Sequence, residues 1–196
     1  VEGIFISHEH SDHIAGLQQL LKCFDIPVYT KQGTWREIQD KLIVPKNQLI
    51  ELTKGSLTLG NLVVEPFAVS HDAADPIGIN VFAGKDKATV VTDTGVISDS
   101  ILRRMDDTTL LVLEANYDPH MLRFGPYQPF LKQRVASDEG HLSNEMAAQA
   151  LLMMNRPDFM QVILAHRSEN NNNAVLVTQT IGKMLVDGGV RIGPEM

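Results

Sequence analysis

The stretch His8-Glu9-His10-Ser11-Asp12-His13 follows a short apolar run, residues 3–7, that is typical of a buried strand. It places three imidazoles and the Asp12 carboxylate within six residues. Imidazole and carboxylate are ligands that Zn²⁺ and similar divalent ions prefer. On a strand or a helix these four side chains could not all face one ion. In a tight loop they can form two sets, His8 with His10 and Asp12 with His13, so the stretch predicts two adjacent metal ions.

Three later motifs each follow an apolar, strand-like run. They are Ser70-His71-Asp72, Thr92-Asp93-Thr94 and Ala165-His166-Arg167. Together with HxHxDH, and in this order, they resemble the metallo-β-lactamase superfamily over nearly the whole chain. The resemblance implies an αββα fold, in which two sheets pack face to face between outer layers of helices.

The resemblance also implies a partition of the metal ligands. One ion would be held by His8, His10 and His71, the second by Asp12, His13 and His166, with Asp93 as the bridge. A bridging carboxylate shares its negative charge between two cations at the ~3.5–4 Å separation of two-metal sites, and a hydroxide between the cations is a nucleophile near neutral pH. Imidazole and carboxylate suit Zn²⁺, Mn²⁺ and Fe²⁺, and we expect two ions of Zn²⁺.

Hydrophobic periodicity and turn residues predict a mixed α/β (α+β) chain. We expect strands over 26–29, 49–52, 57–59, 63–69, 79–83, 88–92, 110–114 and 161–165, and helices over 14–22, 34–42, 98–105, 143–154 and 173–188. The helix from Thr34 would open on a capping box with Glu37, and residues 120–133 are expected to be a loop. We expect one metallo-β-lactamase-like domain over 1–196. Since the superfamily normally carries strands ahead of HxHxDH, we expect a fragment that lacks its N-terminal strands.

Composition excludes several other classes of protein. The chain has 196 residues, of which 43% are hydrophobic, so it can bury a sizeable core. A net charge of −7 argues against nonspecific coating of nucleic acid and requires a local basic patch for any polyanion. A single cysteine, Cys23, excludes an internal disulfide and fits a reducing compartment. No apolar run is long enough to span a bilayer, so we expect a cytoplasmic protein with no membrane partner.

Ligand identity and spacing then narrow the reaction that the resemblance implies. True β-lactamases of this fold usually lack a bridging carboxylate at the Asp93 position, which favours the hydrolase and phosphodiesterase branches. Glyoxalase II-like thioesterases add a C-terminal helical domain for which this chain has no residues. The β-CASP nucleases insert a domain between the Asp and the last His, and the segment from Asp93 to His166 is too short for one.

Three further segments resemble the bacterial YycJ/WalJ-type group of this superfamily. They are Glu114-Ala115-Asn116-Tyr117-Asp118, Gly140-His141-Leu142-Ser143-Asn144 and Ser168-Glu169-Asn170-Asn171-Asn172. The chain departs from the group at Tyr117, where His is common, and at Arg167, where an apolar residue is common. The group is associated with DNA exonuclease activity, so nucleic acid is the expected substrate. With this resemblance, we assign Asp12, Asn116 and His141 to catalysis.

Candidate substrate-binding residues lie outside the ligand set. The stretch 120–133 and its neighbour Arg134 carry cations and aromatic rings that could hold phosphates and bases, although exposed cations are also commonplace on surface loops. The candidates are Arg123, Arg134, Arg167 and Asn171. His141 follows a glycine and precedes a helix, and we expect it to donate a hydrogen bond or proton to the substrate. Alternatively, it only pins its loop through Asp138.

Three functions remain open from the sequence. The first is a dinuclear metal-dependent phosphodiesterase or DNA exonuclease. The second is a small-molecule hydrolase on the same metal centre, such as a lactonase, a cyclic phosphodiesterase or a β-lactamase-like enzyme. The third is a degraded member that binds metal without turnover, which the intact set of ligands disfavours.

Overall fold

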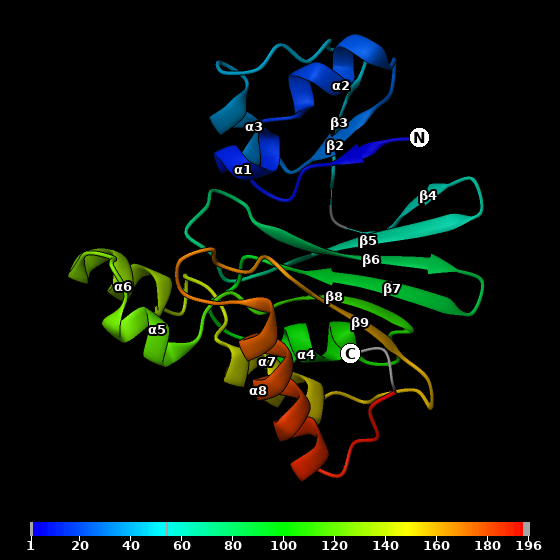
Figure 1. Ribbon diagram of the computed structural model, residues 1–196. Coiled ribbons are helices and arrows are strands. Elements are labelled where there is room, and N and C mark those ends of the chain that lie inside the picture. Colours follow the sequence, from blue (N-terminus) through cyan, green and yellow to red (C-terminus); the bar gives the residue numbers. More distant parts are fainter. Residues whose placement is uncertain (1, 54, 194–196) are drawn as a thin grey trace.

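Two β-sheets lie between two outer layers of helices in the computed structural model, which describes residues 2–53 and 55–193 (Figure 1). The smaller sheet has three parallel strands in the order β1-β2-β3, namely Ile4–Phe5, Val28–Thr30 and Leu49–Glu51. All three residues of β2 are buried, as expected for the central strand of a parallel sheet that is covered on both faces. Helical crossovers join the parallel strands, and the first crossover, which leaves the end of β1, begins with the HxHxDH stretch.

The larger sheet has six strands in the sequential order β4 to β9. Their bounds are Leu57–Leu59, Leu62–Ala68, Ile77–Ala83, Asp86–Val91, Leu110–Glu114 and Gln161–Ala165. Strands β4 to β7 pair antiparallel, whereas β7, β8 and β9 pair parallel. The carboxyl ends of β7, β8 and β9 therefore meet at one edge of the sheet, which is where open α/β sheets place their ligands.

Eight helices are found among the described residues, in three groups (Figure 1). Beside the small sheet lie α1 (Ser11–Ile14), α2 (Leu17–Cys23) and α3 (Gln32–Ile38). Against the large sheet lie α4 (Asp99–Met105), α7 (Asn144–Met153) and α8 (Ala174–Asp187). The remaining two, α5 (Pro119–Phe124) and α6 (Pro129–Val135), form an arm to one side, at the end of the molecule where α1 lies.

Three apolar clusters separate the layers. One joins the small sheet to its helices and includes Val28, Ile14 and Ile38. A second lies between the two sheets, where Tyr29 of β2 meets Ile77 of β6. The largest, which includes Leu111, Leu113, Ala147 and Ile181, lies between the large sheet and α4, α7 and α8. Helices, sheet, sheet and helices thus follow one another, and the expected αββα arrangement is confirmed.

Three local predictions were wrong. Residues 120–133 are not a loop but carry most of α5 and α6, each of which begins with a proline in its first turn. Helix α3 begins at Gln32, so Thr34 is an interior helical residue whose hydroxyl donates to the carbonyl oxygen of Asp75, and there is no capping box. The helix expected over 14–22 is two helices, because α1 ends at Ile14 and α2 begins at Leu17.

Among residues 2–53 and 55–193, no helix has the length and apolar character that a membrane span requires.

Candidate metal centre

Histidine and aspartate side chains from four segments meet where the strands end. The HxHxDH stretch runs from β1 into α1, while His71 follows β5, Asp93 follows β7 and His166 follows β9. Asp93 and His166 adopt φ angles of 56° and 51°, in the left-handed region that residues other than glycine seldom occupy. The chain turns sharply at these two residues, soon after β7 and β9 end, and the side chains of Asp93 and His166 lie close together.

The first cluster contains His8, His10 and His71. Nε2 of His71 lies 3.2 Å from Nδ1 of His10, and one ring nitrogen of each of the three residues lies within 4.8 Å of the others. Nδ1 of His71 lies 3.1 Å from the carbonyl oxygen of Gly140, and Nδ1 of His8 lies 3.1 Å from the hydroxyl of Ser7. Such partners fix ring orientation in metal sites and leave the other nitrogen to face the ion.

The second cluster contains Asp12, His13 and His166. Oδ2 of Asp12 lies 3.5 Å from Nε2 of both His13 and His166. Asp93 reaches both clusters, since Oδ2 is 3.3 Å from Nε2 of His13, and Oδ1 is 3.3 Å from Nε2 of His166 and 3.8 Å from Nε2 of His71. The sequence-predicted ligands are therefore brought together around Asp93, and His8 also groups with His13 and Asp93 across the two sets.

The spacing of these atoms fits a divalent ion. Ligand atoms about 2.0–2.1 Å from a tetrahedral ion lie roughly 3.3 Å from one another. Several separations, from 3.2 to 3.5 Å, are close to this value, and that between Asp93 and His71 is 3.8 Å. Nε2 of His8 supports the same fit, because the His8 side chain is buried and this nitrogen has no hydrogen-bond partner within the described part of the chain.

Glu114 is a site residue to which the sequence analysis gave no role, although it begins one of the three segments that carry the resemblance. It ends β8 and is fully buried, at 0% exposure. Its Oε1 lies 2.7 Å from Nδ1 of His141 and 2.7 Å from Nδ1 of His166, while Oε2 accepts hydrogen bonds from the backbone N–H groups of Thr94 and Leu142. The signal in the sequence is a lone carboxylate at the end of an otherwise apolar strand.

His141 and Asn116 lie beside the ligand clusters. The partner of His141 is Glu114 rather than Asp138, and the bond through Nδ1 leaves Nε2 of His141, which lines the adjoining cavity, without this partner. Nδ2 of Asn116 donates to the carbonyl oxygen of His166 at 2.8 Å, which braces the turn that follows β9. Asn116 thus supports the position of a predicted ligand and also borders the adjoining cavity.

Burial and neighbouring charges shift the pKa values of the ligands in opposite directions. Burial, together with the nearby His13, lowers the pKa of His8 to about 3, and burial also lowers the pKa of His71. Burial alone would lower the pKa of His166, but its hydrogen bond to Glu114 and the charge of Asp93 raise that pKa to about 9. Burial alone would raise the pKa of Asp93, yet the contact with His13 and the charge of His166 hold it well below its usual range.

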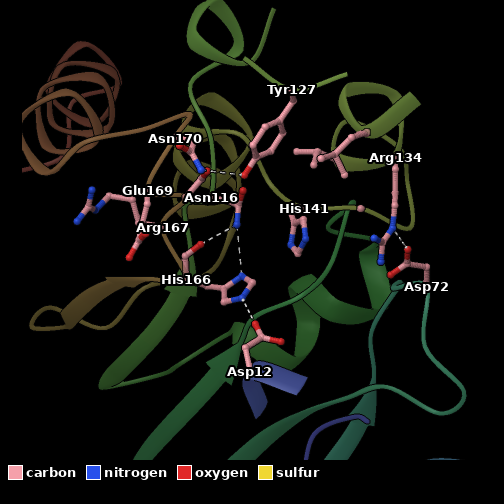
Figure 2. Close-up of a pocket in the computed structure, with 14 residues that line it drawn as sticks. Asp12, Asp72, Asn116, Tyr127, Arg134, His141, His166, Arg167, Glu169 and Asn170 are labelled. Carbon is pink, nitrogen blue, oxygen red and sulfur yellow. Dashed lines mark hydrogen bonds and ion pairs between the residues drawn. The ribbon is translucent and has the colours of Figure 1, made fainter. Parts of the chain in front are cut away.

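A cavity of about 560 Å³ opens over the second cluster (Figure 2). Asp12, His141 and His166 line its floor, and Tyr127 lies on the opposite side. The remaining lining residues include Asp72, Asn116, Leu131, Arg134, Val135, Arg167, Glu169 and Asn170. Two of the four sequence-predicted substrate residues, Arg134 and Arg167, therefore border the cavity.

The other two candidates lie elsewhere. Arg123 is exposed on α5, where its guanidinium lies over the ring of Phe124. Asn171 is fully buried, and its backbone N–H donates to the hydroxyl of Ser168. Neither residue is part of the cavity wall.

An αββα fold with His and Asp side chains gathered at the strand ends defines the class of metallo-β-lactamase-fold proteins. Residues 1–166 match the model of the beta-lactamase superfamily domain. The chain therefore belongs to the beta-lactamase superfamily. Family membership, the His/Asp clusters and the two curated relatives described next together make it a metal-dependent hydrolase.

Two curated relatives and one solved structure are similar to the chain. Exodeoxyribonuclease YycJ of Bacillus anthracis is 36% identical over 195 residues, which cover 98% of this chain and 74% of that protein. Exodeoxyribonuclease WalJ of Streptococcus pneumoniae is 32% identical over 200 residues, which cover 100% of this chain and 74% of that protein. The metallo-beta-lactamase fold protein YhfI from Bacillus subtilis matches with a TM-score of 0.72 at 18% identity, over 94% of this chain and 72% of that one.

Proposed function

We propose that the chain is a dinuclear metal-dependent phosphodiesterase that acts on DNA as an exonuclease. The observation that carries this proposal is the arrangement of two ligand clusters around Asp93, at separations that suit two neighbouring divalent ions. The similarity to exodeoxyribonucleases at 36% and 32% identity favours DNA as the substrate.

The proposed ligands keep the partition inferred from the sequence. His8, His10 and His71 would hold one ion, Asp12, His13 and His166 the other, and Asp93 would lie between them. When bound, two divalent ions such as Zn²⁺, Mn²⁺ or Fe²⁺ polarise a phosphate and lower the pKa of a water molecule that attacks it. The His/Asp donor set suits any of these ions, and Zn²⁺ is the ion that we expect.

His141 is the proposed partner of the leaving oxygen. Its Nδ1 is held by the buried carboxylate of Glu114, so the ring is fixed and Nε2 is directed away from that carboxylate. The residue lines the cavity beside His166, where a bound phosphate would lie (Figure 2). A proton or hydrogen bond from Nε2 would stabilise the negative charge that develops on the departing oxygen.

A comparison of substrates tests the proposal. Purified protein is incubated with Zn²⁺ or Mn²⁺ and given a labelled DNA strand, bis(p-nitrophenyl) phosphate, a lactone and a carbapenem. We expect metal-dependent shortening of the DNA from its end and weak or absent turnover of the carbapenem. Preferential hydrolysis of the lactone or carbapenem, with the DNA left intact, would instead support a small-molecule hydrolase.

A substitution at His141 tests its assigned role. A positioned acid–base group contributes roughly 10²–10⁴-fold in rate, so His141→Ala should lose DNA cleavage on that scale while it keeps both metal ions. The matched control is His120→Ala, because His120 is a helical surface residue outside the cavity. Normal cleavage by a folded His141→Ala protein would remove His141 from catalysis, and loss of a metal ion would make it a ligand.

A further inference from the structure

One wall of the cavity, on the side of the arm, is aromatic and apolar. Tyr127 lies between α5 and α6, and Leu131 and Val135 of α6 also line the cavity, with Val135 next to His141, whose backbone N–H donates to the carbonyl oxygen of Val135. These side chains pack on a small apolar cluster of the arm that includes Tyr117 and Leu122. The Tyr127 hydroxyl accepts a hydrogen bond from Nδ2 of Asn170 at 3.4 Å. The ring is thus held at both ends, while it remains only half-buried and borders the cavity.

Two arginines flank this wall on opposite sides of the cavity (Figure 2). Arg134 donates from Nε to Oδ2 of Asp72, and this ion pair orients its guanidinium. An arginine has five N–H donors, so the terminal amino groups of Arg134 remain available to a phosphate. Arg167 lies on the other side, next to Glu169.

The charge of the arm contrasts with that of the chain. Residues 119–135 contain Arg123, Lys132 and Arg134 and no acidic residue, whereas the whole chain has a net charge of −7. A polyanion would therefore be attracted to the arm and repelled by much of the remaining surface. The cavity volume of about 560 Å³ lies within the ~300–1,000 Å³ range of sites that enclose a small molecule. A cavity of this volume can hold a single nucleotide.

We propose that the cavity is a subsite for one unstacked terminal base of a DNA strand, and that Tyr127 is its stacking platform. The inference rests on the proposed nuclease function and adds the substrate feature that the site recognises. The scissile phosphate would lie over Asp12, His141 and His166, and the base would turn toward the Tyr127 ring on the opposite side (Figure 2). Stacking on an aromatic ring accepts any base, because every base has a π-face.

The subsite has a consequence for substrate choice. A base that stacks on Tyr127 has left its own helix, so a paired end must fray before it can enter. We therefore expect single-stranded and frayed ends to be cleaved faster than blunt ends that are closed by G·C pairs. The rate on a blunt end should rise when its terminal pair is replaced by a mismatch.

The direct test combines a variant with a substrate that lacks the terminal base. Single-stranded oligonucleotides carry an abasic residue at the 5′ end, at the 3′ end or in the middle, and kcat/KM is measured for the wild type and for Tyr127→Leu. Base stacking is worth about 5- to 150-fold per base, so Tyr127→Leu should lose kcat/KM on that scale with an intact end. An abasic residue at the attacked end should slow the wild type by a similar factor and slow the variant by little more.

Two matched variants separate stacking from structure. Tyr127→Phe keeps the ring and loses only the bond to Asn170, so it should stay within about threefold of the wild type. Phe124→Leu removes an exposed aromatic ring of the same arm that does not line the cavity, and should leave kcat/KM unchanged. A readout that needs no cleavage and no variant is the fluorescence of a terminal 2-aminopurine with chelated wild-type protein, which should be quenched on binding.

The outcomes distinguish the inference from the function on which it rests. If the wild type cleaves DNA but discriminates against a terminal abasic residue as strongly in Tyr127→Leu as in the wild type, the stacking role is overturned and the nuclease function stands. An unquenched terminal 2-aminopurine in a bound oligonucleotide would also overturn it. If the wild type neither binds nor cleaves any of the oligonucleotides, both proposals fail together.

Discussion

At the scale of single residues, the centre depends on one carboxylate that touches two imidazoles. Glu114 is fully buried, where an unpaired charge would be costly. Burial alone would raise its pKa, but the hydrogen bonds from His141 and His166 lower it, so the carboxylate stays ionised. Its Oε1 fixes both rings through Nδ1 and leaves each Nε2 for the site. Glu114 therefore positions a predicted ligand and a predicted acid at the same time.

A conservative change at Glu114 should weaken both functions. Glu114→Gln keeps the shape of the side chain but removes its charge, so His166 becomes a poorer ligand and His141 a less well-oriented acid. Loss of such an outer partner typically costs 10–100-fold in metal affinity or activity. Competition with a chelator measures the affinity, and Glu65→Gln, on a surface ion pair with Arg104, is the control. Equal affinities in Glu114→Gln and the wild type would contradict the positioning role.

The raised pKa of His166 predicts release of a proton on metal binding. With a pKa of about 9, His166 is protonated at neutral pH in the metal-free protein, whereas His8, with a pKa of about 3, is already neutral. A metal ligand must be deprotonated, so ion binding at about pH 7.5 should release roughly one proton from His166 and the affinity should rise toward about pH 9. Calorimetry in buffers of different ionisation enthalpy counts the protons. An affinity that is flat over this range would contradict the assignment.

The sequence located the candidate metal ligands better than the residues that hold those ligands in position. His8, His10, Asp12 and His13 are recognisable because they are close together in the chain. The role of Glu114 is visible only in the folded chain, because its partners His141 and His166 lie 27 and 52 residues further along the sequence. Arg123 illustrates the reverse case, since its charge suggested a phosphate contact but the residue does not line the cavity and its guanidinium lies over the Phe124 ring.

At the scale of elements, β8 connects the hydrophobic core to the site. Leu111 and Leu113 are fully buried between the large sheet and its helices, and the next residue along the strand is Glu114. Helix α7 packs in the same core and begins just after His141, with the Ser143 hydroxyl accepting from the backbone N–H of Met146 as its cap. Packing of β8 and α7 therefore sets the distance between Glu114 and His141.

A cavity in this core should be costly. Leu113→Ala removes a fully buried side chain from β8, and such substitutions destabilise by about 2–5 kcal/mol. Ile163→Ala on the neighbouring strand β9 is the control, because Ile163 is 52% exposed and should lose less than about 1 kcal/mol. Urea titration followed by circular dichroism gives both free energies of unfolding. Equal losses in the two variants would mean that β8 does not anchor the core.

The elements that were predicted carry strong local sequence signals, whereas the helices that were missed are short and contain residues typical of loops. Strands such as β8 and capped helices such as α8, where Asn173 accepts from the backbone N–H of Leu176, carry their signals locally. Helices α5 and α6 are only 6 and 7 residues long, and their prolines and the glycine between them suggest a loop. The same prolines occupy first-turn positions, where the missing N–H costs nothing, and Asp118 caps α5.

At the scale of the whole molecule, the site joins the two sheets. The HxHxDH stretch belongs to the small sheet and its helices, whereas His71, Asp93 and His166 follow strands of the large sheet. Bound ions would therefore link the two halves of the sandwich. Because the unfolded chain does not hold the ligands together, the free energy of metal binding adds to the stability of the folded state.

Chelation should accordingly lower the melting temperature. An ion present at a hundred times its dissociation constant adds about 2.7 kcal/mol, which for a chain of this size corresponds to about 5–10 °C. Differential scanning calorimetry with and without chelator measures the shift.

Asp93→Ala is the informative variant, because Asp93 contacts His13 and His166 as well as His71 and its loss should release more than one ion. A fully loaded Asp93→Ala protein would refute the bridging role.

The most direct test of the central claim is a titration of chelated protein with Zn²⁺ or Mn²⁺, in which release of nucleotides from an end-labelled DNA strand is followed against ions bound per chain. The ligand clusters around Asp93 predict no cleavage without metal and a rise in rate that levels off near two equivalents. Full activity in the chelated protein, or a plateau at one equivalent, would contradict a dinuclear metal-dependent nuclease.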